Sequence, residues 1–455
     1  MEIVIFFQVN YDLGITHFNK GSGDLLNISK KKNHSFYYGW VIVCMAALGS
    51  FFSGPGQTYS NSVFIDEYIK SFGWSRSEIS SLYSIATLCS GILMMFMGRL
   101  VDKLGQRKMM VIVSILLGAA CFFNSLVVNT WMMAIGFFLI RLFGQGSMTL
   151  IPNTLVPQWF IQKRGRAMSF LALGGVASAA FFPVANAWLI KLTSWQATWQ
   201  IWGVLLIILF APLAFFIVRN RPEDIGLHPD GKPIINPKSK NRDQMISSSQ
   251  EDDWTLQEAM KTKTFWAVLI CVGIPALVNT GITFHLLSIF GENQLTPQLA
   301  ATVLSLMAII GFPISFISGF ILERVKTNIL LIVVFVLEAA TLLLLTNVNS
   351  VTLGILFGVL WGIGGGIERI TLNIVWSNYF GRKHLGSISG VAMMVMVIGS
   401  ACGPLPLGIG FDKFHGYNES LLLLIIFPII GIVGAILAKK PNKQEFLLKN
   451  AVKVN

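Results

Sequence analysis

Residues 98–108 read Gly-Arg-Leu-Val-Asp-Lys-Leu-Gly-Gln-Arg-Lys, a short charged stretch between two long apolar runs. Gly98 and Gly105 give the backbone the freedom that tight turns need. The carboxylate of Asp102 can accept hydrogen bonds from the N-terminus of a neighbouring helix or from Arg107. We therefore expect a turn that also contacts another part of the molecule; the alternative is a basic loop that only orients two membrane helices.

Further apolar runs continue on both sides of this stretch. A bilayer core about 30 Å thick is crossed by roughly 20 apolar residues in a helix, and the chain contains twelve runs of that kind. They cover 38–60, 79–97, 109–128, 131–157, 167–190, 198–218, 265–290, 298–322, 328–346, 351–377, 385–410 and 420–438. Their length and lack of alternation exclude a β-barrel. The sequence predicts an all-α polytopic membrane protein with 12 transmembrane helices.

The composition supports this class and excludes several others. Of the 455 residues, 54% are hydrophobic and 12% are charged, whereas soluble domains have about 45–50% and about 25%. A soluble fold could not bury so much apolar surface. The five cysteines lie in apolar runs without metal-ligand spacing, so we expect neither a disulfide framework nor a metal site. No nucleotide-binding or hydrolase motif occurs, so we expect neither enzyme activity nor a cofactor.

The distribution of positive charge predicts the orientation of the helices. With both termini in the cytoplasm, 28 of the 34 Lys and Arg residues lie on the cytoplasmic side. Two lie within spans, and the opposite side holds Lys70, Arg76, Lys191 and Lys413. Because cytoplasmic loops of membrane proteins are enriched in Lys and Arg, we expect a multi-pass protein of the cell (plasma) membrane. The net charge of +12 then needs no nucleic-acid partner.

The chain divides into two halves of six spans. Residues 219–263 are polar, contain several prolines and carry eight basic and eight acidic residues, as is typical of a flexible linker. We expect a cytoplasmic N-terminal tail (1–36), a first bundle (37–218), this cytoplasmic linker (219–263), a second bundle (264–438) and a cytoplasmic C-terminal tail (439–455).

The two halves also resemble each other at offsets of about 220 residues, which indicates an internal duplication. Parallel repeats with a substrate site between them are typical of transporters that expose the site to each side in turn. The matched pairs are Gly144 with Gly364, Gly146 with Gly366, Asn153 with Asn373, Phe160 with Phe380, Gly98 with Gly319, Leu100 with Ile321, Asp102 with Glu323 and Lys103 with Arg324.

The stretch at 98–108 resembles the signature loop of the major facilitator superfamily, G-x-L-x-D-[RK]-x-G-x-R-[RK], at every fixed position. The resemblance covers about residues 37–438, and 319–326 is a degenerate second copy. It implies two pseudosymmetric six-helix bundles and secondary transport. The residues that it implies for the conformational loop are Gly98, Asp102, Lys103, Gly105, Arg107 and Lys108.

Three segments are similar to a narrower branch, the monocarboxylate porters and oxalate/formate antiporters. They are 37–40 (Tyr-Tyr-Gly-Trp), 159–167 (Trp-Phe-Ile-Gln-Lys-Arg-Gly-Arg-Ala) and 221–227 (Arg-Pro-Glu-Asp-Ile-Gly-Leu). This resemblance implies small organic anions as substrates, coupled to protons or to a counter-anion. The chain departs from that branch in spans 8 and 11, which carry no charge.

Ionisable residues inside a membrane are costly and mark functional candidates. The spans contain Arg141, Glu338, Glu368, Arg369 and His285. In the superfamily, spans 1, 4, 7 and 10 line the cavity, which places all but Glu338 on cavity helices. We interpret Glu338, on the peripheral span 9, as a packed structural group that can hold a proton.

The repeat relates the charged candidates to one another. Arg141 aligns with Trp361, and Glu368 follows Trp361 by two helical turns on the same face. We expect Arg141 to bind an anionic substrate group, with Trp361 and Glu368 facing the same cavity as further substrate-binding candidates. Glu368 is a candidate proton carrier, and alternatively a structural ion-pair partner of Arg141. His285 is a second proton candidate, or a hydrogen-bonded interfacial histidine.

Amides on cavity helices are further candidates for substrate binding: Gln57, Gln145, Asn153 and Asn373. Residues 141–146 also loosely resemble the R-x-x-Q-G motif of proton/drug antiporters, with one extra residue. The alternatives to organic-anion transport are therefore proton-coupled efflux of drugs or amphiphiles and, from another class, a membrane sensor (transceptor) on the same fold. The expected partners are a small-molecule substrate, protons or a counter-anion, and the lipid bilayer.

Overall fold

The computed structural model describes residues 37–74, 76–231 and 252–451. Within these ranges the regular structure is helical without strands, and 12 helices or runs of helix are long and apolar enough to cross a membrane. This confirms the predicted fold class. The N-terminal tail and the centre of the predicted linker lie outside the described residues.

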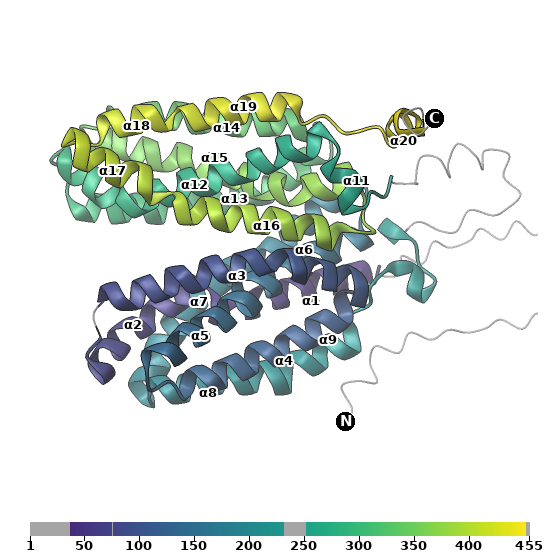
Figure 1. Ribbon diagram of the computed structural model, residues 1–455, viewed down its shortest axis with the longest axis horizontal. Coiled ribbons are helices and arrows are strands. Elements are labelled where there is room, and N and C mark those ends of the chain that lie inside the picture. The colour runs from purple at the N-terminus through teal and green to yellow at the C-terminus, as the bar shows by residue number, and fades with distance from the viewer. Residues whose placement is uncertain (1–36, 75, 232–251, 452–455) are drawn as a thin grey trace, which may run out of the picture. The chain divides into compact units, whose positions relative to one another are not determined.

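The first six spans form one bundle, drawn purple to teal in Figure 1. Span 1 is interrupted, and spans 4 and 6 each contain a π-helical segment. In chain order the elements are α1 (Gly39–Phe52), η2 (Gly54–Gly56), α2 (Thr58–Phe72), α3 (Arg76–Leu104), α4 (Gln106–Ser125), α5 (Thr130–Ile140), η3 (Arg141–Ser147), α6 (Met148–Trp159), α7 (Arg164–Leu192), α8 (Trp195–Val204), η4 (Leu205–Phe210) and α9 (Ala211–Ile217).

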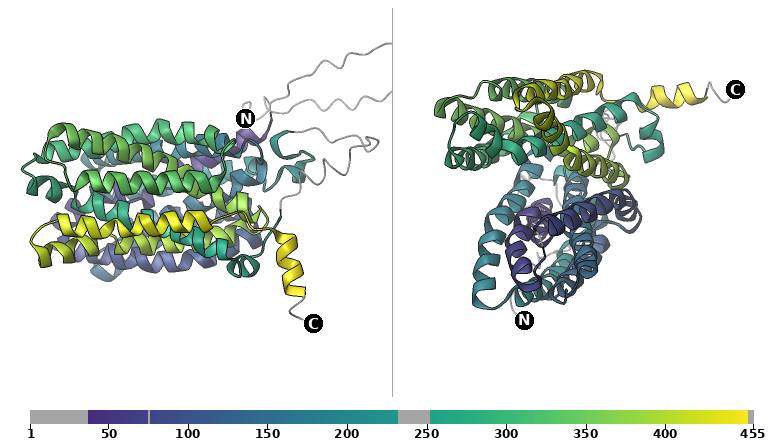
Figure 2. Two further views of the ribbon diagram at one scale, coloured as in Figure 1. Left: turned by 90° about the horizontal axis from the view of Figure 1, so that it is seen from above. Right: turned by 60° about the vertical axis from the view of Figure 1, so that its left-hand side comes forward.

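The last six spans form the second bundle, drawn green to yellow beside the first (Figures 1 and 2). The spans are α12 (Lys263–Glu292), α13 (Pro297–Leu322), α14 (Thr327–Leu345), α15 (Val351–Phe380), α16 (Leu385–Cys402) with α17 (Pro404–Phe414), and α18 (Asn418–Leu424) with α19 (Ile426–Leu437). Shorter helices are η5 (Pro222–Ile225), η6 (Pro229–Gly231), α11 (Leu256–Met260) and α20 (Lys443–Ala451).

Polar side chains determine where several spans begin. Asn129, Ser194, Thr262, Thr296 and Ser350 each accept a hydrogen bond from the backbone N–H three residues ahead. These side chains satisfy amides that the first turn of a helix leaves unpaired. The helices after them therefore start at fixed positions in the short polar loops.

The two bundles are in contact at the end of the spans where the first span starts and the last one ends, called here the terminus side. Asp102 on α3 accepts hydrogen bonds from the backbone N–H groups of Gly386 (2.7 Å) and Ser387 (2.6 Å). Arg164, 2% exposed, donates to Asn378 Oδ1 at 2.8 Å. The Gln158 side chain donates to the carbonyl oxygen of Arg382 at 2.7 Å.

A second contact between the bundles repeats the geometry around Asp102. Glu323, directly after α13, forms an ion pair of 2.9 Å with Arg166 on α7 and also accepts its backbone N–H. Gly98 lies against Gly386 in one interface, and Gly319 lies against Gly165 in the other. The degenerate second copy of the signature loop thus occupies the equivalent position in the duplicated half.

The two ends of the predicted linker pack against the bundles. Asp230 accepts hydrogen bonds from the backbone N–H groups of residues 161–163, and Asp253 accepts those of Arg382 and Lys383. Tyr37 donates to the carbonyl oxygens of Trp159 (2.8 Å) and His228 (3.1 Å). Burial, with the nearby Asp230 charge, raises the Tyr37 pKa, so the phenol remains a donor. The flexible linker predicted over 219–263 is therefore ordered at both ends.

We expect Gly165→Val to weaken closure of the terminus side. A Cβ at residue 165 would overlap the carbonyl oxygen of Gly319, and overpacking typically costs about 1–3 kcal/mol. Ser315, 2% exposed, provides the readout. A cysteine at position 315, in a chain without the native cysteines, should react faster with a thiol reagent in this variant. Gly291→Val, whose Cβ meets no atom within 4 Å, is the control; equal labelling in both variants would contradict the prediction.

Candidate functional site

Arg141 is buried inside the first bundle with neutral partners. It is 4% exposed, and its Nη1 donates to Gly56 O and Thr58 Oγ1, both at 3.2 Å. The guanidinium carbon lies 4.9 Å from the centre of the Tyr83 ring. The Nε atom is buried without a hydrogen-bond partner. A buried cation without an acidic partner is costly, which makes Arg141 suited to an anionic ligand.

Although Arg141 itself is buried, two residues that contact its side chain are at least partly exposed to solvent. Thr58 is exposed and Tyr83 is partly exposed, and the Tyr83 hydroxyl donates to Thr58 Oγ1 at 3.0 Å. Gln57 is also partly exposed and donates to Ser53 Oγ at 3.0 Å, at the break between η2 and α2. Because this break leaves Gly56 O outside a regular helix, the carbonyl can accept from Arg141.

Arg141 begins a π-helical turn that extends to Ser147. A π-helix accommodates one more residue per hydrogen-bonded turn than an α-helix and is frequent at functional sites. The sequence 141–146 differs from R-x-x-Q-G by one extra residue. The π-helical turn has room for this residue within the span. Gly146 therefore packs below Arg141, where a Cβ would lie 3.4 Å from the Arg141 carbonyl oxygen.

The remaining amide candidates of this bundle lie on the same span. Gln145 belongs to the π-helical turn and is partly exposed. Asn153 on α6 donates to Thr149 O at 2.9 Å, and its Oδ1 is buried without a partner. Among the described residues, neither side chain is hydrogen-bonded to Arg141.

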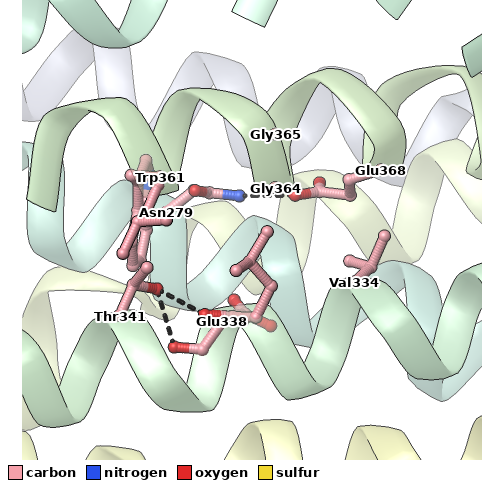
Figure 3. A pocket seen from close by; sticks show the side chains of 10 residues that line it. Asn279, Val334, Glu338, Thr341, Trp361, Gly364, Gly365 and Glu368 are labelled. Carbon is pink, nitrogen blue, oxygen red and sulfur yellow. Dashed lines mark hydrogen bonds between the residues drawn. The ribbon is translucent and has the colours of Figure 1, made fainter. Parts of the chain in front are cut away.

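Glu368 and Trp361 lie inside the second bundle. They line a small cavity between α12, α14 and α15, together with Asn279 and Glu338. Asn279 Nδ2 donates to Glu368 Oε2 at 3.1 Å (Figure 3). Trp361 is 7% exposed and packs on Phe357, with ring centres 5.3 Å apart. The sequence predicts that Glu368 and Trp361 share a helix face, but it does not predict that Asn279 and Glu338 lie next to them.

Arg369, Asn373 and His285 lie elsewhere in the second bundle. Arg369 and Asn373 are exposed on α15, and the Asn373 side chain donates to Arg369 O at 2.9 Å. Both ring nitrogens of His285 have partners, Nδ1 with the Tyr417 hydroxyl at 3.0 Å and Nε2 with Pro404 O at 3.2 Å. This is the arrangement of the hydrogen-bonded histidine that the sequence left as an alternative.

The ion pair between Arg141 and Glu368, an alternative left open by the sequence, is not formed. Arg141 bonds to Gly56 and Thr58, and Glu368 bonds to Asn279. Each charge is therefore held within its own bundle. The structure separates the buried Arg141 of the first bundle from the cavity with two glutamates in the second.

The signature-loop residues are at the terminus side. Of the two partners considered for Asp102, the structure has the N-terminus of α16. Arg107 instead stacks on Phe215, 4.8 Å from the ring centre, and donates to the Phe215 carbonyl oxygen. Gly105 has φ of 82° between α3 and α4, which requires glycine. Lys103 and Lys108 are exposed.

Within the described residues, twelve spans in two related bundles, joined at one end by glycine contacts and by the carboxylates of Asp102 and Glu323, define a membrane transporter built from two halves. The chain belongs to the Major Facilitator Superfamily, whose family model matches residues 46–404. Members of this family are transporters, not enzymes.

Two relatives cover most of the chain at low identity. One is the "Multi-drug resistance efflux pump PmrA homolog" of Lactococcus lactis, 22% identical over 89% of this chain and 95% of its own length. The other is the "Probable L-galactonate transporter" of Escherichia coli, 22% identical over 87% of each chain. These relatives do not single out the monocarboxylate or oxalate/formate branch.

Solved structures share the fold. The proton:xylose symporter XylE superposes with a TM-score of 0.65 at 13% identity, covering 88% of this chain and 94% of that one. The Escherichia coli fucose:proton symporter FucP gives 0.63 at 15% identity, covering 89% of this chain and all of that one.

Proposed function

We propose that the protein is a secondary active transporter of a small organic anion, driven by protons or by anion exchange. The observation that carries this proposal is the buried guanidinium of Arg141, which has only neutral partners and whose buried Nε–H has no hydrogen-bond partner among the described residues. A carboxylate would satisfy both the charge and the free donor, since the planar guanidinium fork suits carboxylates.

The transport cycle proposed here alternates between closure at the two ends of the spans. The terminus side, which we assign to the cytoplasm from its excess of Lys and Arg, is closed in this structure by the contacts of Asp102, Arg164 and Glu323. Substrate reaches Arg141 from the opposite side, past Thr58 and Tyr83. Breaking the terminus-side contacts and closing the other end would then release it.

A screen of uptake into proteoliposomes tests the substrate class. We would impose a pH gradient and offer labelled lactate, pyruvate, formate, oxalate and galactonate; galactonate is included because one relative is named for it. We expect at least one of these anions to accumulate, and the others of similar size to compete with it. Absence of uptake of all five, with folded protein in the liposomes, would reject the proposal.

Efflux of drugs or amphiphiles is the second candidate. Two observations favour it: the relative named as a multi-drug efflux pump homologue, and the π-helical turn that brings 141–146 into line with the R-x-x-Q-G pattern. An amphiphilic cation would gain nothing from the Arg141 charge. Proton-driven extrusion of such a cation, without uptake of any anion, would establish this alternative.

A further inference from the structure

The cavity between α12, α14 and α15 (Figure 3) is lined by oxygen-bearing side chains from all three helices. They are Asn279, Glu338, Thr341 and Glu368, and the rest of the lining is apolar or glycine. The cavity volume is about 10 Å³, at the lower limit of what a single water needs. It is therefore too small for an organic substrate.

Glu338 is the unusual residue of this cavity. Its side chain is 8% exposed, and neither carboxylate oxygen has a hydrogen-bond partner among the described residues. An ionised carboxylate in such a place costs several kcal/mol, because no protein donor stabilises its charge. Glu338 must therefore bind a proton or another cation from the cavity.

Glu368 is the ionisable group on the other side of the cavity. It is partly exposed, and the Asn279 amide fixes one of its oxygens. Two carboxylates that share a small site do not ionise together, because their charges repel. Glu368 thus lies where it can exchange a proton with solvent, and Glu338 lies where a proton is retained.

The other charged groups near this pair have different surroundings. Of the helices that pack against α14, α19 has no titratable residue, α18 carries only the exposed Glu419, and α15 carries the exposed Arg369 beside Glu368. On α12, His285 is bonded to Tyr417 and Pro404, and Cys271 lies against Gly431. Glu368 on α15 is therefore the ionisable partner of Glu338 on α14 across the cavity.

We propose that Glu338 and Glu368 share one exchangeable proton in this cavity, and that the gradient of this proton drives transport. The inference rests on the proposed function, since it names the coupling ion and its site. In the step, a proton from water neutralises Glu368, and a water in the cavity relays it to the carboxylate of Glu338. The substrate anion binds separately at Arg141, so substrate and proton occupy different bundles.

Glu338→Gln tests the site because glutamine keeps the shape and cannot exchange a proton. In proteoliposomes loaded with the anion that the uptake screen identifies, we would compare accumulation driven by a pH gradient with exchange of labelled for unlabelled anion without a gradient. We expect driven accumulation to fall by at least about tenfold and exchange to stay within about twofold of the unchanged protein. Preserved exchange also shows that the variant is folded.

The matched control is Glu419→Gln, which neutralises an exposed glutamate of the same bundle and should change neither rate. The proposal would be overturned if the Glu338→Gln variant still accumulated the anion in response to a pH gradient. It would also be overturned if a sodium gradient, but not a pH gradient, drove accumulation in the unchanged protein. If the unchanged protein exchanges no anion at all, the proposed function fails instead.

Infrared spectroscopy tests the cavity without any substrate. A carboxylic acid that retains its proton gives a carbonyl stretching band that a carboxylate lacks. We expect this band in purified protein near neutral pH, its loss in Glu338→Gln, and its persistence in Glu419→Gln. A spectrum that is identical in all three proteins would show that Glu338 holds no proton and would overturn the proposal.

Discussion

Replacing Arg141 by Gln should reduce anion uptake by about 100-fold or more, the largest effect expected for any single side chain of the first bundle. A buried charged hydrogen-bonding partner typically contributes about 2–5 kcal/mol to the binding of an opposite charge, and each 1.4 kcal/mol is about tenfold. Arg141→Lys should recover part of the rate, because lysine keeps the charge but lacks the planar fork. Uptake of the labelled anion, measured as a function of its concentration, gives the transport rate of each of the two variants.

Protein stability distinguishes a binding role of Arg141 from a structural one. The side chain has no acidic partner to be left behind, and its bonds go to Gly56 O and Thr58 Oγ1. We expect Arg141→Gln to change the free energy of unfolding by no more than about 1 kcal/mol, because desolvation of the charge offsets the lost bonds. Arg99→Gln, at an exposed arginine, is the control. Unfolding of the Arg141 variant, or uptake equal to that of the Arg99 variant, would contradict the binding role.

Much of the fold could be predicted from the sequence, because membrane spans are set by local composition. Each run of apolar residues is long enough to cross the bilayer, and polar caps such as Asn129 and Ser350 begin the next helix. The breaks inside spans are harder to predict. The π-helical turn at Arg141 depends on how Gly56 and Gly144 pack between spans 1 and 4, which local composition does not specify.

The candidate sites could be predicted only in part, because helical periodicity gives the face of a residue but not the helix opposite it. Glu368 and Trp361 were placed on one face, and the structure has them in one cavity. Glu338 was interpreted as structural because span 9 is peripheral, yet its side chain extends inward toward that same cavity. Thr58 and Tyr83 reach Arg141 from other spans, so only tertiary packing shows them.

Asp102→Asn should lower the transport rate by about 10- to 100-fold, because it destabilises the state in which the terminus side is closed. Asp102 accepts three hydrogen bonds from the start of α16. The donors are the backbone N–H groups of Gly386 and Ser387 and the hydroxyl of Ser387. Asparagine keeps one acceptor and presents an N–H₂ group to a donor, and hydrogen bonds to a charged group contribute about 1.5–3 kcal/mol. Spin labels at positions 104 and 383 would measure the closure, and we expect longer distances in the variant.

Glu323, the residue that matches Asp102 in the second half of the chain, provides the comparison for this prediction. Glu323 forms the equivalent contact, but its partner Arg166 has a side chain that is 40% exposed, and exposed ion pairs contribute only about 0–1 kcal/mol. Asp102, in contrast, accepts two backbone N–H groups, at 2.7 and 2.6 Å, at the positive end of the α16 dipole, whereas Glu323 accepts one, from Arg166, at 3.3 Å. We therefore expect Glu323→Gln to reduce transport much less than Asp102→Asn, and Asp412→Asn, at an exposed residue, to have no effect. Equal loss in the Asp102 and Glu323 variants would contradict the larger contribution assigned here to the Asp102 contact.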